Sequence, residues 1–262
     1  MTTLAVHALE CRHGARTVLS GIDLSFGPGL TALVGPNGSG KSTLLRHLAG
    51  LDHAAAGRVE LDGRPPDVLP APERARAIAY LPQAASVYWP LSGADVVALG
   101  RVPHGADLGR PLSAVDAEAV RRALQRVDGL AFADRTIDAL SQGERARLML
   151  ARLLATEAGV VLADEPVASL DPAYALQAMA VLRSEAARGA CVVASLHDLG
   201  LAARFADRVV VLADGKAVAD GPPARALRPE VIDKAYAVDF HPVTIDGIVQ
   251  PIAWTPRAPH PF

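Results

Sequence analysis

A glycine-rich run in the N-terminal part of the chain has the composition and spacing of a phosphate-binding loop. It follows the apolar segment Leu30–Val34 and leads into a helical pattern at 42–49, which is the strand–loop–helix setting that GxxxxGK[ST] requires. Backbone amides of such a loop converge on phosphate oxygens at a helix N-terminus, whose dipole favours an anion. Lys41 is expected to reach the β- and γ-phosphates, the Ser42 hydroxyl to bind Mg²⁺, and Thr43 to contact the α-phosphate side. The whole candidate loop comprises Gly35, Pro36, Asn37, Gly38, Ser39, Gly40, Lys41, Ser42 and Thr43.

Two acidic residues close another apolar segment and could carry out hydrolysis beside that loop. Val160–Ala163 has the pattern of a buried strand and ends in Asp164 and Glu165. An aspartate there would place its carboxylate beside the Mg²⁺ coordination shell, and the glutamate could polarise an attacking water as general base. An apolar strand that ends in acids is, on its own, usually a plain strand end. Together with the phosphate-binding loop, the pair predicts a nucleotide site that hydrolyses its ligand.

The elements that must position these residues alternate between apolar runs and helical patterns. This alternation predicts an α/β domain with a largely parallel sheet. Strands are expected at Leu4–Glu10, Ile22–Phe26, Leu30–Val34, Arg58–Leu61, Ile78–Leu81, Val160–Ala163, Ala190–Ser195 and Arg208–Leu212. Helices are expected at Ala94–Gly100, Ser113–Val127, Gln142–Thr156 and Pro172–Arg188, besides the one after the loop.

Between the predicted strands lie segments of other kinds. Residues 83–157 carry helical patterns without a strand pattern, which predicts a helical insertion. The prolines of residues 64–76 indicate an exposed loop rather than an element. Ala213–Lys216 has the composition of a hairpin turn, and the tail after Gly221 is expected to form two small helices before a proline-rich end.

Composition limits the kinds of protein that this chain can be. The 262 residues are half hydrophobic and 21% charged, which is typical of a globular protein long enough for one large α/β domain. A net charge of −2 argues against a nucleic-acid binder, which usually has a strongly basic face. No apolar run approaches the roughly 20 residues that span a bilayer, and no signal-peptide pattern is present, so a cytoplasmic protein is expected. Cys11 and Cys191 are expected to be buried thiols.

Four further segments, in a fixed order, resemble the motifs of ATP-binding cassette (ABC) proteins. Leu140–Glu144 resembles the LSGGQ signature, Tyr80–Gln83 the Q-loop, Ser169–Asp171 the D-loop and Ser195–Asp198 the switch-histidine segment. The chain is thus similar to an ABC transporter ATPase subunit over nearly its whole length. The resemblance implies an α/β fold with a P-loop NTPase (RecA-like) core, a helical insertion and an antiparallel β subdomain. It also implies one nucleotide-binding domain over residues 1–262, with a helical subdomain at about 84–157 and a short C-terminal tail at about 222–262.

The resemblance also assigns a ligand and roles within one chain. It implies that the chain binds ATP with Mg²⁺ and hydrolyses the ATP. Glu165, His197 and Gln83 would be catalytic: Glu165 as general base, His197 as the residue that touches the γ-phosphate, and Gln83 as a contact to the metal and the attacking water. Mg²⁺ would be held by Ser42, Gln83 and Asp164.

Other residues would act across a dimer. Ser141 opens a helix, so its hydroxyl and the amides after it can form an anion site. The resemblance implies that Ser141, Gln142 and Gly143 face the γ-phosphate bound by the opposite subunit, so that two copies close on two ATP molecules. Asp171 would lie at the dimer contact, and it can also cap the helix that starts at Pro172.

Two positions depart from the family pattern. Gln142 stands where the signature usually has glycine, whereas the following glycine is kept as Gly143. His13, within Arg12–Gly14, occupies the place of the aromatic residue that stacks on adenine. Its smaller ring predicts weaker stacking than the ~1–3 kcal/mol of an aromatic platform. A surface loop residue without contact to the base is the alternative, and the sequence leaves both open.

The segment Asp95–His104 narrows the class of transporter. It resembles the VALGRxPH segment of importer ATPases for iron-siderophore complexes, haem and cobalamin. The resemblance implies two integral-membrane permease subunits, a periplasmic or surface substrate-binding protein, and a peripheral position at the cytoplasmic face of the inner membrane. A soluble non-transport ABC ATPase, such as one for iron–sulfur assembly, is the alternative. Tyr88 and Trp89 are a hypothetical contact to a membrane subunit, with core packing as the other reading.

Overall fold

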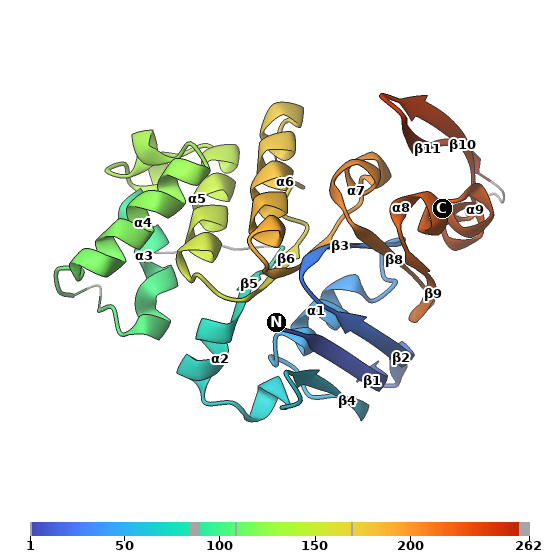
Figure 1. Cartoon of the computed structure of the whole chain (residues 1–262), viewed down its shortest axis with the longest axis horizontal. Helices are drawn as coiled ribbons and strands as arrows, with labels where there is room; N and C mark the ends of the chain where they lie inside the picture. Colours follow the sequence, from blue (N-terminus) through green and yellow to red (C-terminus); the bar gives the residue numbers. More distant parts are fainter. Residues whose placement is uncertain (1, 84–89, 108, 169, 257–262) are drawn as a thin grey trace.

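A six-stranded sheet forms the centre of the computed structural model, which describes residues 2–83, 90–107, 109–168 and 170–256 (Figure 1). Its strands lie in the order β5-β6-β7-β3-β8-β9; the first five are parallel and β9 is antiparallel to β8. The predicted parallel sheet is thereby confirmed. The bounds are β3 (Gly29–Val34), β5 (Ile78–Leu81), β6 (Val160–Asp164), β7 (Cys191–Ser195), β8 (Arg208–Ala213) and β9 (Lys216–Gly221).

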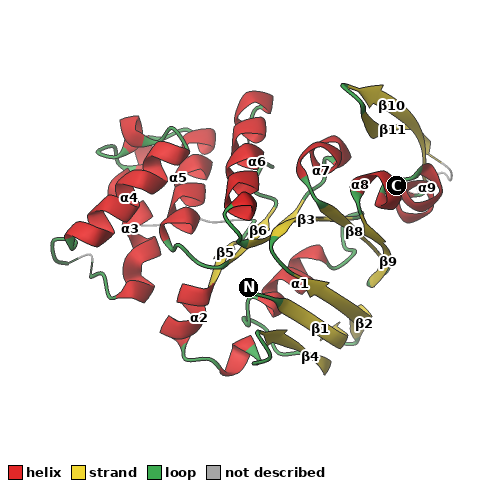
Figure 2. Cartoon of the chain, viewed as in Figure 1, coloured by secondary structure: helices red, strands yellow, loops and turns green. Residues whose placement is uncertain are grey.

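Both faces of this sheet are covered, which explains why its strands are continuous apolar runs. Along β3, Ala32 and Val34 pack into a core with helices α6 (Pro172–Ala187) and α7 (Leu199–Phe205). Leu33, between them, faces the other way, into a core with α1 and the antiparallel sheet. Figure 2 shows α1 and the antiparallel sheet on the side of the central sheet opposite α6 and α7. The alternation of side chains along a strand places one half of each strand in each core.

The second sheet is the expected antiparallel β subdomain, with strand order β2-β1-β4. Its strands are longer than predicted: β1 covers Leu4–His13, β2 covers Arg16–Phe26 and β4 covers Ala56–Leu61. Helix α1 (Lys41–Leu48) lies between the two sheets and packs Leu44, Leu45 and Leu48 into their shared core. The P-loop helix is therefore fixed from both sides.

The predicted helical insertion is also present, at the left of Figure 1. It contains α3 (Gly93–Ala98), α4 (Ala114–Arg126) and α5 (Gln142–Ala155), with the 3₁₀ segments η2 (Leu99–His104), η3 (Leu130–Phe132) and η4 (Ile137–Ala139). Each α-helix starts after a serine whose hydroxyl accepts from a backbone amide of the first turn: Ser92, Ser113 and Ser141. Such caps satisfy amides that have no partner inside the helix, and they fix where each helix begins.

The prediction of an exposed loop at residues 64–76 is wrong. This stretch contains η1 (Pro66–Val68) and α2 (Ala71–Ala77). Pro66 is the first residue of η1 and Pro72 the second residue of α2. At those positions the missing amide hydrogen breaks no helical hydrogen bond, so proline starts a helix there instead of preventing one.

The C-terminal tail holds more structure than predicted. The two small helices are confirmed as α8 (Pro223–Ala226) and α9 (Pro229–Tyr236). A hairpin follows, formed by β10 (Val238–Ile245) and β11 (Ile248–Pro256), which the sequence analysis missed. Its turn is Asp246-Gly247, with φ of 51° and 77°. Asp-Gly between apolar runs is a strong hairpin signal, so the sequence did contain the information.

Two clusters of charge hold the helical part in place, and the first surrounds Arg101. This side chain on η2 is only 4% exposed; its Nε donates to Asp116 on α4 at 2.8 Å. Its Nη1 donates to the Ala155 carbonyl at 2.8 Å and to the Glu157 carboxylate at 2.9 Å. His104 places Nε2 2.9 Å from a carbonyl oxygen in the same turn, that of Thr156. Through Arg101 and His104, the segment that resembles importer ATPases is thus bonded to the start of α4 and to the end of α5.

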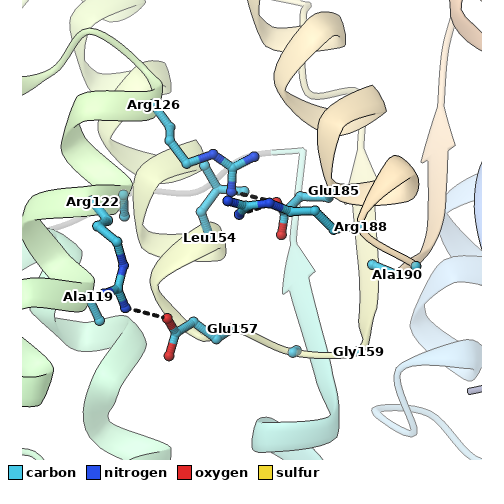
Figure 3. A pocket seen from close by; sticks show the side chains of 12 residues that line it. Ala119, Arg122, Arg126, Leu154, Glu157, Gly159, Glu185, Arg188 and Ala190 are labelled. Atoms are coloured by element: carbon cyan, nitrogen blue, oxygen red, sulfur yellow. Dashed lines mark hydrogen bonds and ion pairs between the residues drawn. The ribbon is translucent and has the colours of Figure 1, made fainter.

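The second cluster lies between the helical part and the core, around a cavity of about 380 Å³ (Figure 3). Arg126 on α4 pairs with Glu185 on α6 at 2.5 Å, and Arg188 contacts the same carboxylate at 3.4 Å. Arg122 pairs with Glu157 at 2.8 Å. Each of the two glutamates that line this cavity is paired with an arginine, so we interpret the cavity as a joint between two parts of the fold.

Replacing Arg101 with alanine should lower the free energy of unfolding by about 3 kcal/mol, because a largely buried carboxylate and a carbonyl lose their donor. Arg110, 81% exposed and 3.7 Å from Asp107, is the matched control; Arg110→Ala should change stability by less than about 0.5 kcal/mol. Denaturant titrations of both variants measure the difference.

The pH dependence gives an independent check on this pair. The Ser113 hydroxyl and the Arg101 guanidinium lower the pKa of Asp116 below its ordinary value of 3.8. A lowered pKa stabilises the fold above the unfolded-state pKa, and that stabilisation disappears as the pH falls through the folded-state pKa. The difference between wild type and Arg101→Ala should therefore shrink below about pH 4. Equal losses for Arg101→Ala and Arg110→Ala at neutral pH would contradict this role.

Candidate functional site

A cavity of about 350 Å³ opens where the carboxyl ends of β3, β6 and β7 meet. The carboxyl edge of a parallel sheet is the usual ligand position in such folds. Nine of the predicted site residues line it, with one residue that was not predicted, Val18 on β2. The lining consists of Val18, Asn37, Gly38, Gly40, Lys41, Ser42, Thr43, Gln83, Glu165 and His197.

The loop keeps its shape through close backbone approaches that require glycine. A Cβ on Gly35 would stand 2.1 Å from the carbonyl oxygen of Leu212, and one on Gly40 would stand 2.4 Å from the Leu19 side chain. Both glycines have positive φ, 151° and 102°, where other residues are strained. The Ser39 hydroxyl is buried inside the loop with no hydrogen-bond partner. A buried orphan hydroxyl in a turn of converging amides fits a site that receives phosphate oxygens.

Lys41 is the cation of this cradle. It is only 5% exposed, and its Nζ donates to the carbonyls of Gly35 at 2.8 Å and Pro36 at 3.2 Å. Burial lowers the pKa of Lys41, while the nearby carboxylates of Glu165 and Asp164 act in the opposite direction. The carbonyl contacts hold the ammonium group against the loop, in position for an anion bound there.

The two predicted acids are held by Ser195 at the end of β7, which begins the predicted switch-histidine segment but was given no contact to these acids. Its hydroxyl, fully buried, donates to Asp164 Oδ1 at 2.6 Å and accepts from the Glu165 amide at 2.8 Å. Asp164 is 3% exposed. The register pairs Asp164 with Ser195, so adjacent strand ends bring them together. The sequence signal for this role of Ser195 was a polar residue at the end of the apolar stretch Cys191–Ala194.

Glu165 connects three parts of the chain. Its φ of 51° is left-handed, a strained conformation for a non-glycine residue and one that often marks functional sites. One carboxylate oxygen accepts from Gln83 Nε2 at 2.6 Å, and the other contacts His197 Nε2. The three residues predicted to be catalytic are therefore in direct contact, although Gln83 and Glu165 are 82 positions apart.

The predicted signature residues lie outside the cavity lining. Ser141 caps α5 as expected, and Glu144 completes a capping box by accepting from the Ser141 amide at 2.7 Å. Gly143 has room for a side chain, since an added Cβ would meet only Leu170, at 3.9 Å. Nothing within the described chain requires glycine there. Asp171 caps α6, accepting from the backbone of the first turn at 3.1 Å, so both predicted caps are confirmed.

For some of the other residues singled out in the sequence, the structure leaves the predicted contact untested. His13 ends β1 and is exposed, and the cavity residue from this sheet is Val18. Stacking of His13 on adenine stays a prediction. The predicted contact of Gln142 with the γ-phosphate of the opposite subunit also stays a prediction; Gln142 is exposed and follows the cap residue Ser141. Tyr88, Trp89 and Ser169 lie outside the described residues. The two cysteines are buried free thiols, as predicted.

The described residues include neither a helix that could span a membrane nor a group of typical metal-binding side chains. No helix in ranges 2–83, 90–107, 109–168 and 170–256 has the length and apolarity to cross a bilayer. Over the same residues, no three histidine, cysteine or acidic side chains gather in a way that could hold a metal ion. The predicted magnesium ligands are of a different composition: Ser42 and Gln83 line the cavity, and Asp164 is buried at the end of β6, near enough to Lys41 to influence its pKa. Such mixed oxygen donors, one carboxylate among them, suit Mg²⁺.

Comparison with known proteins identifies the family. A model described as ABC transporter matches residues 19–168. The hemin import ATP-binding protein HmuV of Rhodococcus jostii (strain RHA1) is 42% identical over 254 residues, which cover 95% of this chain and 86% of that protein. The protein of that name from Pseudomonas entomophila (strain L48) is 41% identical over 99% of this chain and 98% of its own. This chain belongs to the ABC transporter family, as one of its ATPases.

Solved structures confirm the fold. An inward-facing ABC transporter of metal-chelate type matches with a TM-score of 0.82 over 97% of this chain and 98% of that chain, at 22% identity. A dimeric ATP-binding cassette with bound ADP and phosphate matches with a TM-score of 0.73 over 84% of this chain and 98% of its own, at 24% identity. The predicted P-loop NTPase core with its helical insertion and antiparallel subdomain is therefore correct.

Removal of the Ser195 hydroxyl should damage the site without unfolding the sheet. Ser195→Ala leaves Asp164 without its donor and the Glu165 amide without its acceptor, so ATP hydrolysis should fall roughly 10-fold or more, as for other residues that orient ligands. Thr31→Ala is the control, since Thr31 is a buried hydroxyl on neighbouring β3, paired with Val193. Equal activity of the two variants, both folded by circular dichroism, would refute the role of Ser195.

Proposed function

We propose that the chain hydrolyses Mg-ATP to power the import of haem through a membrane transporter. The observation that carries the hydrolytic part is the contact of Glu165 with both Gln83 and His197 at the mouth of the phosphate loop. A carboxylate in that position can take a proton from an attacking water. The transport part rests on relatives near 40% identity that are named for hemin import.

In the proposed reaction, the loop amides and Lys41 bind the phosphate chain and stabilise the charge that builds up during transfer. Water attacks the γ-phosphorus, the bond to the bridging oxygen of ADP breaks, and Glu165 accepts the proton that the water loses. Bound Mg²⁺, held by Ser42, Gln83 and Asp164, would neutralise phosphate charge. ADP and phosphate are the products.

His197 and Gln83 occupy both carboxylate oxygens of Glu165 in this structure. For the glutamate to take a proton, at least one of these contacts must lengthen or shift. We infer that a bound γ-phosphate competes with Glu165 for the His197 N–H and draws the imidazole away, because phosphate oxygens also accept charge-assisted hydrogen bonds. The same competition would couple nucleotide binding to Gln83, which leads into the helical part.

The complete site would need two copies of the chain. Ser141 and Gly143 are not among the residues that line the chain's own cavity, and the open space at Gly143 fits the close approach of a ligand from outside. In the proposed homodimer, these residues and Gln142 close on the γ-phosphate of the partner subunit, and Asp171 lies at the contact. Two integral-membrane permease subunits and a substrate-binding protein would complete the transporter, with this chain at the cytoplasmic face of the inner membrane.

Replacement of Glu165 with glutamine should lower ATP hydrolysis by at least about 100-fold, because an amide cannot accept the proton. ATP should still bind, and an ATP-dependent dimer should accumulate in sedimentation velocity. Glu118→Gln, which changes an exposed glutamate on α4, is the control and should keep wild-type turnover. A Glu165→Gln protein that hydrolyses at the control rate would exclude Glu165 as general base.

The cargo is tested in the assembled transporter. In vesicles that contain the chain with its co-purifying membrane subunits, a haem-loaded binding protein should raise ATPase activity several-fold over the empty binding protein. Cobalamin-loaded and ferric-siderophore-loaded binding proteins serve as matched comparisons. If only the cobalamin-loaded or only the ferric-siderophore-loaded binding protein stimulated the ATPase, that compound would replace haem as the cargo. Isolation of an active chain with no membrane partner would favour the soluble alternative.

A further inference from the structure

A side chain outside the predicted loop stands beside the phosphate cradle: Arg16, the first residue of β2. In the β1–β2 ladder Arg16 lies opposite His13 across the turn, and it is two residues before Val18. Residues two apart on a strand point to the same side. Since Val18 lines the nucleotide cavity, Arg16 faces the same side, closer to the end of the hairpin.

The guanidinium reaches the loop itself. Arg16 Nη2 lies 3.9 Å from the position that a Cβ on Gly38 would take, and Gly38 is part of the cavity lining. Gly38 has a positive φ of 78° and lies in the middle of the predicted phosphate-binding loop. The side chain thus extends from the antiparallel sheet across to the P-loop.

Arg16 is also a cation without a counter-ion. Across the described part of the chain its side chain forms no hydrogen bond or ion pair. Other arginines of this protein are engaged bidentately, such as Arg46 with Asp52 and Arg208 with Asp220. Lys41, by contrast, is held by two loop carbonyls. Arg16 therefore keeps all its donors free at the entrance of an anion site.

We propose that Arg16 binds the phosphate chain of the nucleotide, an inference that rests on the proposed ATPase function. A guanidinium forms charge-assisted, often bidentate hydrogen bonds with phosphate oxygens, which suits a donor fork with no other partner. The described lining of the cavity holds no phenylalanine, tyrosine or tryptophan to stack on the base. Arg16 would anchor the phosphate end of the nucleotide and so offset weak stacking at the base end.

The test measures Mg-ATP affinity by calorimetry for wild type, Arg16→Ala, Arg16→Lys and Arg12→Ala. Arg12→Ala is the matched control, because it removes the same charge from the same hairpin and Arg12 lies opposite Thr17 in the ladder. Arg16→Ala should raise the dissociation constant about tenfold, the size expected for one charge-assisted contact at a partly open site. Arg16→Lys should recover part of the loss, and Arg12→Ala should stay within twofold of wild type.

A second measurement separates phosphate binding from contact with the base. Inorganic triphosphate with Mg²⁺ competes against a fluorescent ATP analogue, and its inhibition constant should rise by the same factor in Arg16→Ala. An unchanged constant for triphosphate, with weakened ATP, would overturn the phosphate assignment in favour of base contact. Equal ATP affinity of wild type and Arg16→Ala would overturn the proposal altogether. If wild type itself bound no ATP, the failure would lie with the proposed function.

Discussion

The close packing of the phosphate loop against the end of β8 is the constraint on which the site depends. Gly35 lies so near the Leu212 carbonyl that no other residue fits. In the loop held there, the Gly35 carbonyl accepts from Lys41, and α1 starts at that lysine. The α1 leucines then join the sheet to the antiparallel subdomain. One backbone contact thus fixes the loop, its lysine and the joint between the two sheets.

The proposed hydrolytic residues are brought together by strand order rather than by local sequence. Parallel pairing of β6 with β7 places Ser195 beside Asp164, and the turn after β6 presents Glu165 in a strained backbone conformation. Gln83 arrives from the end of β5, the neighbour of β6 on its other side. Contacts at this one edge therefore link the nucleotide cavity to the segment that enters the helical part. Within that part, the buried Arg101 side chain ties η2 to the start of α4 and to the end of α5.

Much of this arrangement was predictable from the sequence, because the strands are apolar runs and the loop and caps are local patterns. Ser141 and Asp171 cap their helices as predicted, since a cap depends only on residues within one turn. The function of Ser195 was not predictable, because its partner Asp164 lies 31 residues away and only the strand register reveals the pair. The helices at residues 66–77 were not predicted because proline was expected to interrupt helices. In η1 and α2 it lies in the first turn, where it favours the start of a helix. The Asp246-Gly247 hairpin was missed although its turn signal was present.

The central claim is that a glycine-framed backbone loop and one buried lysine bind Mg-ATP. Equilibrium titration of Mg-ATP against wild-type chain and Lys41→Ala tests it directly. One nucleotide should bind per chain, and the alanine variant should lose at least about two orders of magnitude in affinity, because a buried charge-assisted contact to the phosphates disappears. Equal affinity of the two proteins, or a wild-type chain that retains no nucleotide, would contradict the account.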